Sequence, residues 1–93
     1  MKGDDVRKLI DEANQRERKD YQKMDIEELS AELRGVMEFE RVIFEKIEDM
    51  EKKGTEQDLL NYAKIVIKNT TGREISEIQE IYLKKIDNEY LSS

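Results

Sequence analysis

Apolar residues recur every three or four positions along almost the whole chain, and no proline interrupts them. This spacing places them along one side of a helix, whereas a half-buried strand would need an apolar residue at every second position. Because proline breaks a helix interior, its absence allows long helices. The pattern predicts an all-α fold: an antiparallel bundle of three to four helices. With 93 residues, we expect a single domain over residues 1–93.

Two places in the chain carry clear signals for the end of one helix and the start of the next. Asp25 can cap the first backbone amides of a following helix, and Glu28 stands at the matching position of a capping box. Further on, Gly54 follows two lysines, and glycine readily adopts the left-handed conformation that ends many helices. Thr55 has Asp58 three residues later, which predicts that a new helix starts there.

A third break is predicted at the polar stretch from Asn69 to Gly72. These residues are weak helix formers, and Thr71 and Glu74 have the spacing of another capping box. The segment between the second and third breaks is the most apolar in the chain, so we expect a central helix that is buried on several sides. With these breaks, the predicted helices span residues 4–22, 26–53, 56–68 and 73–90.

The predicted second helix is long for a chain of this size. Its roughly 28 residues would extend about 42 Å, whereas a compact domain of this length is about 32 Å across. Part of its apolar stripe then lacks a partner, unless the helix bends at Gly35 or lies along an equally long first helix. Unpaired apolar surface usually marks an interface. We therefore expect a homo-oligomer, most simply a homodimer, that forms through this helix as a coiled coil.

The candidate interface combines the core stripe of the second helix with apolar residues beside it. Glu40 stands where the seven-residue repeat calls for an apolar side chain. It could fix the register of a dimer by pairing with an arginine of a partner chain, or a slight rotation of the helix could turn it to solvent. The candidate interface residues are Val36, Phe39, Glu40, Val42, Ile43 and Ile47.

A cluster of cations near the end of the first predicted helix is the candidate for nucleic-acid contact. It lies beside Tyr21, and cations next to an aromatic ring are typical of surfaces that bind single strands. However, two acidic residues interrupt it, and a net charge of −6 provides no long-range attraction for a polyanion. The alternative is that the cluster balances the acidic second helix within the chain. Its cations are Arg16, Arg18, Lys19 and Lys23.

Missing residue types exclude several kinds of chemistry. Without cysteine or histidine, the chain offers no thiolate or imidazole ligand and no disulfide. We expect no enzyme activity, no cofactor and no metal site. The longest apolar run, Ile65 to Ile67, is far too short to span a membrane, and a signal peptide is not apparent, so we expect a cytoplasmic protein. A composition rich in Lys, Glu and Ile is typical of thermophile proteins, although a mesophile with a low-GC genome could have the same composition.

These features together predict a small acidic module that binds an unidentified protein partner and associates with itself through its second helix. Two alternatives stay open. One is a nucleic-acid-associated regulatory or replication-accessory protein of a virus, plasmid or archaeon that uses the basic cluster. The other is an acidic mimic of nucleic acid, for which Glu38, Glu45 and Glu48 share a helix face. The stretch from Leu60 to Glu74 resembles part of the helical domain of archaeal GINS replication-factor subunits, which implies the replication-accessory alternative.

Overall fold

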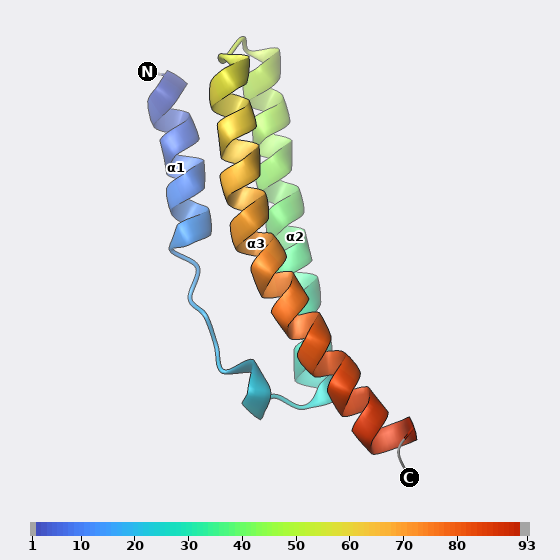
Figure 1. Ribbon diagram of the computed structural model, residues 1–93. Coiled ribbons are helices and arrows are strands. Elements are labelled where there is room, and N and C mark those ends of the chain that lie inside the picture. Colours follow the sequence, from blue (N-terminus) through green and yellow to red (C-terminus); the bar gives the residue numbers. More distant parts are fainter. Residues whose placement is uncertain (1, 92–93) are drawn as a thin grey trace.

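The computed structural model describes residues 2–91, and this part of the chain contains helices and no strand. The prediction of an all-α bundle is confirmed. Figure 1 shows the arrangement: α2 and α3 form a long antiparallel hairpin, and α1 lies beside α3 near the turn that joins them. The elements are α1 (Lys2–Asn14), the 3-10 turn η1 (Tyr21–Lys23), α2 (Ile26–Lys52), α3 (Gln57–Ile86) and the π-helical turn η2 (Asp87–Leu91).

The local signals around α2 act as predicted. The Asp25 carboxylate accepts a hydrogen bond from the Glu28 amide at 2.8 Å, and the Glu28 carboxylate accepts one from the Asp25 amide at 3.3 Å. The capping box is therefore present. Gly54 has a φ of 88°, the left-handed conformation expected after the end of a helix. The start signal at Thr55 is wrong, because Glu56 is the cap residue of α3 and its side chain makes no capping bond.

The predicted break at residues 69–72 is absent, and α3 runs through it as one helix. The hydroxyls of Thr70 and Thr71 each lie 3.0 Å from the backbone carbonyl oxygen four residues earlier, so the helix itself satisfies them. Thr71 is also fully buried and contacts the Glu40 carboxylate on α2. Burial and these hydrogen bonds outweigh weak helix propensity. The prediction of two helices over 56–68 and 73–90 is therefore wrong.

α1 ends at Asn14, so the prediction of a helix over 4–22 is also wrong. Residues 15–25, here called the strap, connect α1 to α2 and are not α-helical; their one helical turn is η1. The Asn14 side chain lies 3.4 Å from the Thr70 hydroxyl of α3, and the next residue, Thr71, contacts Glu40 of α2. Asn14 is therefore near the level of Glu40, which is about 21 Å along α2 from Ile26. A helical strap would cover only about 16 Å, whereas an extended one covers about 3.3 Å per residue. The strap must therefore be extended for α1 to reach its place.

Two separate cores lie along the hairpin. At the turn end, α1 packs against α2 and α3; at the other end, the strap covers the hairpin. The turn-end core contains Val6, Leu9, Ala13, Ile43, Ile47, Leu60, Ala63 and Ile67. The strap-end core contains Tyr21, Leu29, Val36, Ile78 and Ile81.

The molecule is elongated, measuring 57 × 20 × 16 Å. Its radius of gyration is 16.2 Å, compared with about 12 Å for a compact domain of this length. α3 has 30 residues and α2 has 27, so α3 accompanies α2 along its length. The expectation that α2 extends beyond its partners is therefore wrong. It assumed that the remaining helices are short, which the continuity of α3 contradicts.

Candidate protein-binding face

Three of the six candidate interface residues on α2 belong to the cores of the chain itself. Val36, Ile43 and Ile47 are at most 1% exposed. Because residues of α3 share both cores with them, another protein cannot contact these side chains without unfolding the chain. These three residues therefore cannot form part of an interface with another protein. The reason is again the length of α3, which covers the stripe that the sequence left without a partner.

The other three candidates have different surroundings. Phe39 is half-buried against the turn-end core, and the guanidinium carbon of Arg16 lies 4.5 Å from the centre of its ring. Glu40 is half-buried and accepts a hydrogen bond from Thr71 of α3, a contact within the chain that neither alternative for this residue included. Val42 is 37% exposed. The structure therefore does not bring the six residues together on one accessible surface.

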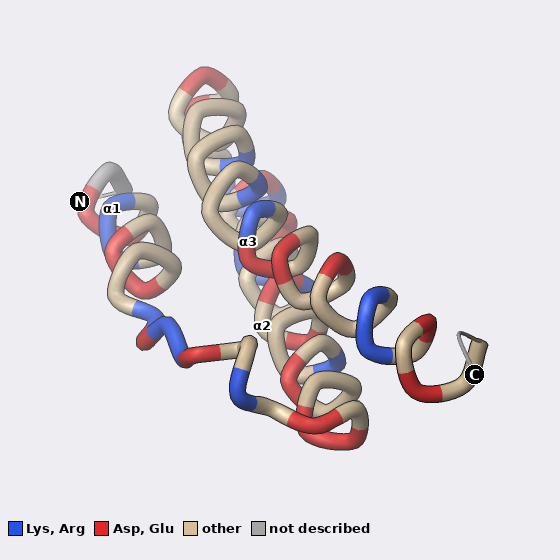
Figure 2. The backbone as a smooth tube through the Cα atoms, turned by 60° about the horizontal axis from the view of Figure 1, so that its bottom comes forward, with Lys and Arg blue, Asp and Glu red and all other residues tan. Residues whose placement is uncertain are grey.

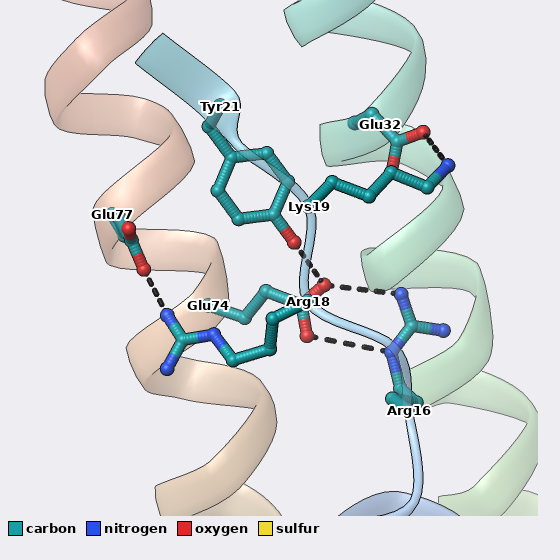
Figure 3. A network of polar contacts seen from close by, with 7 residues as sticks. All are labelled: Arg16, Arg18, Lys19, Tyr21, Glu32, Glu74 and Glu77. Atoms are coloured by element: carbon teal, nitrogen blue, oxygen red, sulfur yellow. Dashed lines mark hydrogen bonds and ion pairs between the residues drawn. The ribbon is translucent and has the colours of Figure 1, made fainter.

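Three cations of the candidate nucleic-acid site, Arg16, Arg18 and Lys19, pair with acidic residues of the two long helices (Figure 3). Arg16 donates two hydrogen bonds to the Glu74 carboxylate of α3, at 3.1 and 3.4 Å, and the Tyr21 hydroxyl donates a third at 2.7 Å. Glu74 is only 4% exposed. We call Arg16, Tyr21 and Glu74 the clamp, because these three residues tie the strap to α3.

The clamp changes the acidity of its members. Burial would raise the pKa of the Glu74 carboxyl, but the hydrogen bonds from Arg16 and Tyr21 outweigh it, and the pKa is lowered. Burial, together with the hydrogen bond to Glu74, raises the pKa of Tyr21 to about 12. Glu74 therefore remains a carboxylate and Tyr21 a neutral phenol over the whole physiological range.

The remaining cations of this cluster also pair within the chain. Arg18 contacts Glu77 on α3, and Lys19 donates to Glu32 on α2 at 2.6 Å (Figure 3). The hydrogen bond from Lys19 to Glu32 raises the pKa of Lys19. Lys23 lies 3.8 Å from Asp20 within the strap. These contacts give the cluster a structural role. Arg16 and Arg18 pair with acidic residues of α3, and Lys19 pairs with one of the acidic α2.

Sequence reasoning missed Glu74 and Tyr21 as partners, although one signal was present. Glu74 lies between Ile67 and Ile78 at spacings of seven and four, which places it on the buried stripe of α3. A buried carboxylate needs a cation and hydrogen-bond donors. The strap supplies them.

The acidic face of α2 is partly neutralised by its own arginine. Arg41 contacts both Glu38 and Glu45, one turn away on either side. The hydrogen bond from Arg41 lowers the pKa of the Glu38 carboxyl. Two of the three acids that would mimic nucleic acid therefore share one cation, while Glu48 is exposed.

Exposed apolar side chains gather instead on the N-terminal half of α3. Leu59, Tyr62 and Ile65 follow one another at three-residue steps and are 36%, 60% and 62% exposed. An open groove runs on each side of them. The groove towards α1 is lined by Val6, Arg7, Ile10, Asp11, Leu59 and Tyr62. The groove towards α2 is lined by Phe44, Lys64, Ile65, Lys68 and Asn69. We call Leu59, Tyr62 and Ile65 with these two grooves the α3 face.

The α3 face also differs from the rest of the molecule in charge. Residues 59–73 contain no acidic residue, although the chain as a whole carries a net charge of −6. In Figure 2, this part of α3 is tan and blue. Its charged residues are Lys64, Lys68 and Arg73, and the Lys68 ammonium lies 5.9 Å from the centre of the Phe44 ring. The part of the α3 face that α3 itself contributes is therefore apolar with a basic side.

The expectation that residues 56–68 are buried on several sides is only partly met. α3 contacts α1 on one side and α2 on another, and the side between the two grooves is open. Hydropathy identified the most apolar segment of the chain, but three helices provide too little cover for all of it. A segment with more apolar residues than the neighbouring helices can bury is therefore the sequence signal for this exposed face.

Comparison of the chain with models of protein families, with curated proteins and with solved structures finds no match. Over the described residues, no three acidic side chains gather in a way that could hold a metal ion. No helix in this part of the chain is both long and apolar enough to cross a membrane.

Proposed function

We propose that the chain is a helical module that binds another protein through the α3 face. One observation carries the proposal: Leu59, Tyr62 and Ile65 expose more than a third of their surface at successive turns of one helix, between two grooves. Single exposed apolar residues are common and need no explanation. A row of them beside grooves is typical of protein interaction sites.

The rest of the molecule holds this face in shape. α1 supplies Val6 and Ile10 to one groove, and the position of α1 depends on the strap that follows it. The clamp and the Arg18–Glu77 and Lys19–Glu32 pairs fix the strap to both long helices. A preorganised surface loses less conformational freedom when a partner binds. In this proposal the polar network supports binding without contacting the partner.

Self-association through α2 has less support than binding through α3. Among the large apolar residues of α2, only Met37 and Val42 are exposed, at 51% and 37%. Arg41 and its two glutamates occupy much of the outer surface between them. The exposed apolar residues therefore support binding at the α3 face more than at α2.

Site-specific photo-crosslinking in the native host tests the proposal. A photoreactive amino acid replaces Tyr62 on the α3 face or, as the control, Gln79 on the exposed side of the same helix. We expect the Tyr62 position to give a covalent adduct of defined mass with another protein and the Gln79 position to give none. Equal labelling from both positions, or adducts only from Gln79, contradicts the proposal.

A further inference from the structure

We infer that the α3 face binds an amphipathic helix of another protein, in which acidic residues flank the apolar stripe. This inference rests on the proposed function and specifies the chemistry of the partner. It concerns the groove between α2 and α3 on the side away from α1, where Ile65 and Phe44 are the apolar lining residues.

The chain itself provides a template for the occupant. On the other side of α3, α1 packs against the hairpin with Val6, Leu9 and Ala13, spaced three and four residues apart. An amphipathic helix is the element that fits a groove between two helices in this way. The groove with Ile65 is the corresponding place on the opposite side, and no helix of the described chain fills it.

The positive charge of the groove favours a partner helix with acidic residues on either side of its apolar stripe. Lys64 and Lys68 line it, and none of its lining residues is acidic. The same pairing occurs on the other side of the hairpin, where Glu12 of α1 lies 3.7 Å from Lys46 of α2. Complementary charges of this kind favour one partner over another and set its orientation. A helix with glutamates beside its apolar stripe satisfies both lysines.

A second copy of the chain is a poorer occupant. A two-fold contact through this groove places the same surface on both sides of the interface. Lys64 and Lys68 of each copy would then enter one interface whose lining contains no carboxylate. Like charges across an interface disfavour association. The observed charges therefore favour another protein.

Two synthetic helical peptides test this inference. Both have about 18 residues, a length of about 27 Å, and the same leucine stripe; one carries glutamates on either side of the stripe and the other lysines. Fluorescence anisotropy gives their dissociation constants. We expect the glutamate peptide to bind about tenfold more tightly, a difference of about 1.4 kcal/mol, because it can form exposed ion pairs with both lysines.

Charge reversal within the groove provides the decisive variant. The double variant Lys64→Glu/Lys68→Glu should prefer the lysine peptide. The control variant Lys23→Glu/Lys84→Glu changes the net charge equally at exposed positions outside the groove and should keep the original preference. A preference that shifts equally in both variants overturns the inference, because it would reflect net charge alone.

A further pair of variants separates this inference from the proposed function. Ile65→Ser and Leu83→Ser each remove an apolar residue from α3 that is 62% or 64% exposed, but only Ile65 lines the groove. If wild type binds the two peptides equally and Ile65→Ser weakens both, the face binds helices and only the acidic preference is overturned. If neither peptide binds and Ile65→Ser dissociates a dimer in sedimentation experiments, the occupant is a second copy. If Ile65→Ser behaves like Leu83→Ser in every assay, the proposed function falls as well.

Discussion

At its turn end the hairpin is covered by a third helix, whereas at its other end it is covered by an extended strap. The turn-end core draws apolar residues from all three helices. The strap contributes one fully buried side chain, Tyr21, and half-buried Met24, and it holds its place through the clamp and neighbouring ion pairs. Apolar packing is strong without being directional, while charged hydrogen bonds demand exact geometry and the right protonation state. The two ends should therefore respond to different perturbations.

The largest effect is expected at the turn end. Leu60 is completely buried in that core, so Leu60→Ala removes buried apolar surface and leaves a cavity. We expect the free energy of unfolding to fall by about 3 kcal/mol, measured by chemical denaturation. Leu59→Ala is the matched control, since its side chain is 36% exposed, and it should cost less than about 1 kcal/mol. Equal losses would contradict the complete burial of Leu60.

A smaller loss is expected when the clamp is broken. Glu74→Gln keeps the shape of the side chain but leaves Arg16 without its carboxylate. We expect a loss of about 2 kcal/mol at neutral pH, because the deleted charge is buried and hydrogen-bonded. Glu77→Gln is the control. It breaks the ion pair between Glu77 and Arg18, whose side chains are 44% and 59% exposed. This variant should cost less than about 0.5 kcal/mol.

The same pair of variants gives an acid pH test. Because folding lowers the pKa of Glu74, its contribution is present above its unfolded pKa of about 4.3 and is lost as the pH falls through the folded value. Wild type should therefore lose more stability between neutral pH and about pH 3 than Glu74→Gln does. Parallel curves for the two proteins would contradict the charged state of the clamp.

Tyr21→Phe tests the hydroxyl of the clamp alone. The ring still fills the strap-end core, so we expect a loss of only about 1 kcal/mol. Folding raises the pKa of Tyr21 to about 12, against about 10 in an unfolded chain. Its contribution is thus fully present below about pH 10 and is lost as the pH rises through the folded value. Ultraviolet titration of phenolate should show a late step that Tyr21→Phe removes and Tyr62→Phe retains.

The smallest expected effect is a gain in stability at Gly72, which lies on α3 between the two cores. A methyl group added at Gly72 meets nothing within 4 Å. Gly72 lies inside α3, so Gly72→Ala should raise the free energy of unfolding by up to about 1 kcal/mol. Gly54→Ala is the control of opposite sign, since its φ of 88° strains any other residue. A loss at Gly72 would indicate that α3 bends there in solution.

Local signals predicted the parts of the fold that depend on neighbours in sequence. The capping box at Asp25 and the left-handed Gly54 place α2 within one residue of its observed end. The end of α1 and the continuity of α3 depend on distant partners instead. Thr71 is helical because α2 buries it, and the strap is extended because it must span the distance back to Ile26. Neither cause is visible in a window of a few residues.

The candidate site was harder to predict for a related reason. Hydropathy identified Leu59, Tyr62 and Ile65 as apolar, but it cannot show which apolar residues find cover. The cations of the strap were correctly seen as a cluster, yet their partners Glu74 and Glu77 lie on a distant helix. The site therefore emerged only once the arrangement of the three helices was known.

The contacts between the strap and α3 also determine the order in which the chain can fold during synthesis. Arg16 and Glu74 are 58 residues apart in sequence, and Lys85 donates at 2.9 Å to the carbonyl oxygen of Gln22, 63 residues earlier. α2 and α3 are joined by a short turn, so their contacts need only a small loop to close. We expect the hairpin to form first. The strap leaves the ribosome before either long helix, yet it reaches its final position last, when the final turns of α3 have been made.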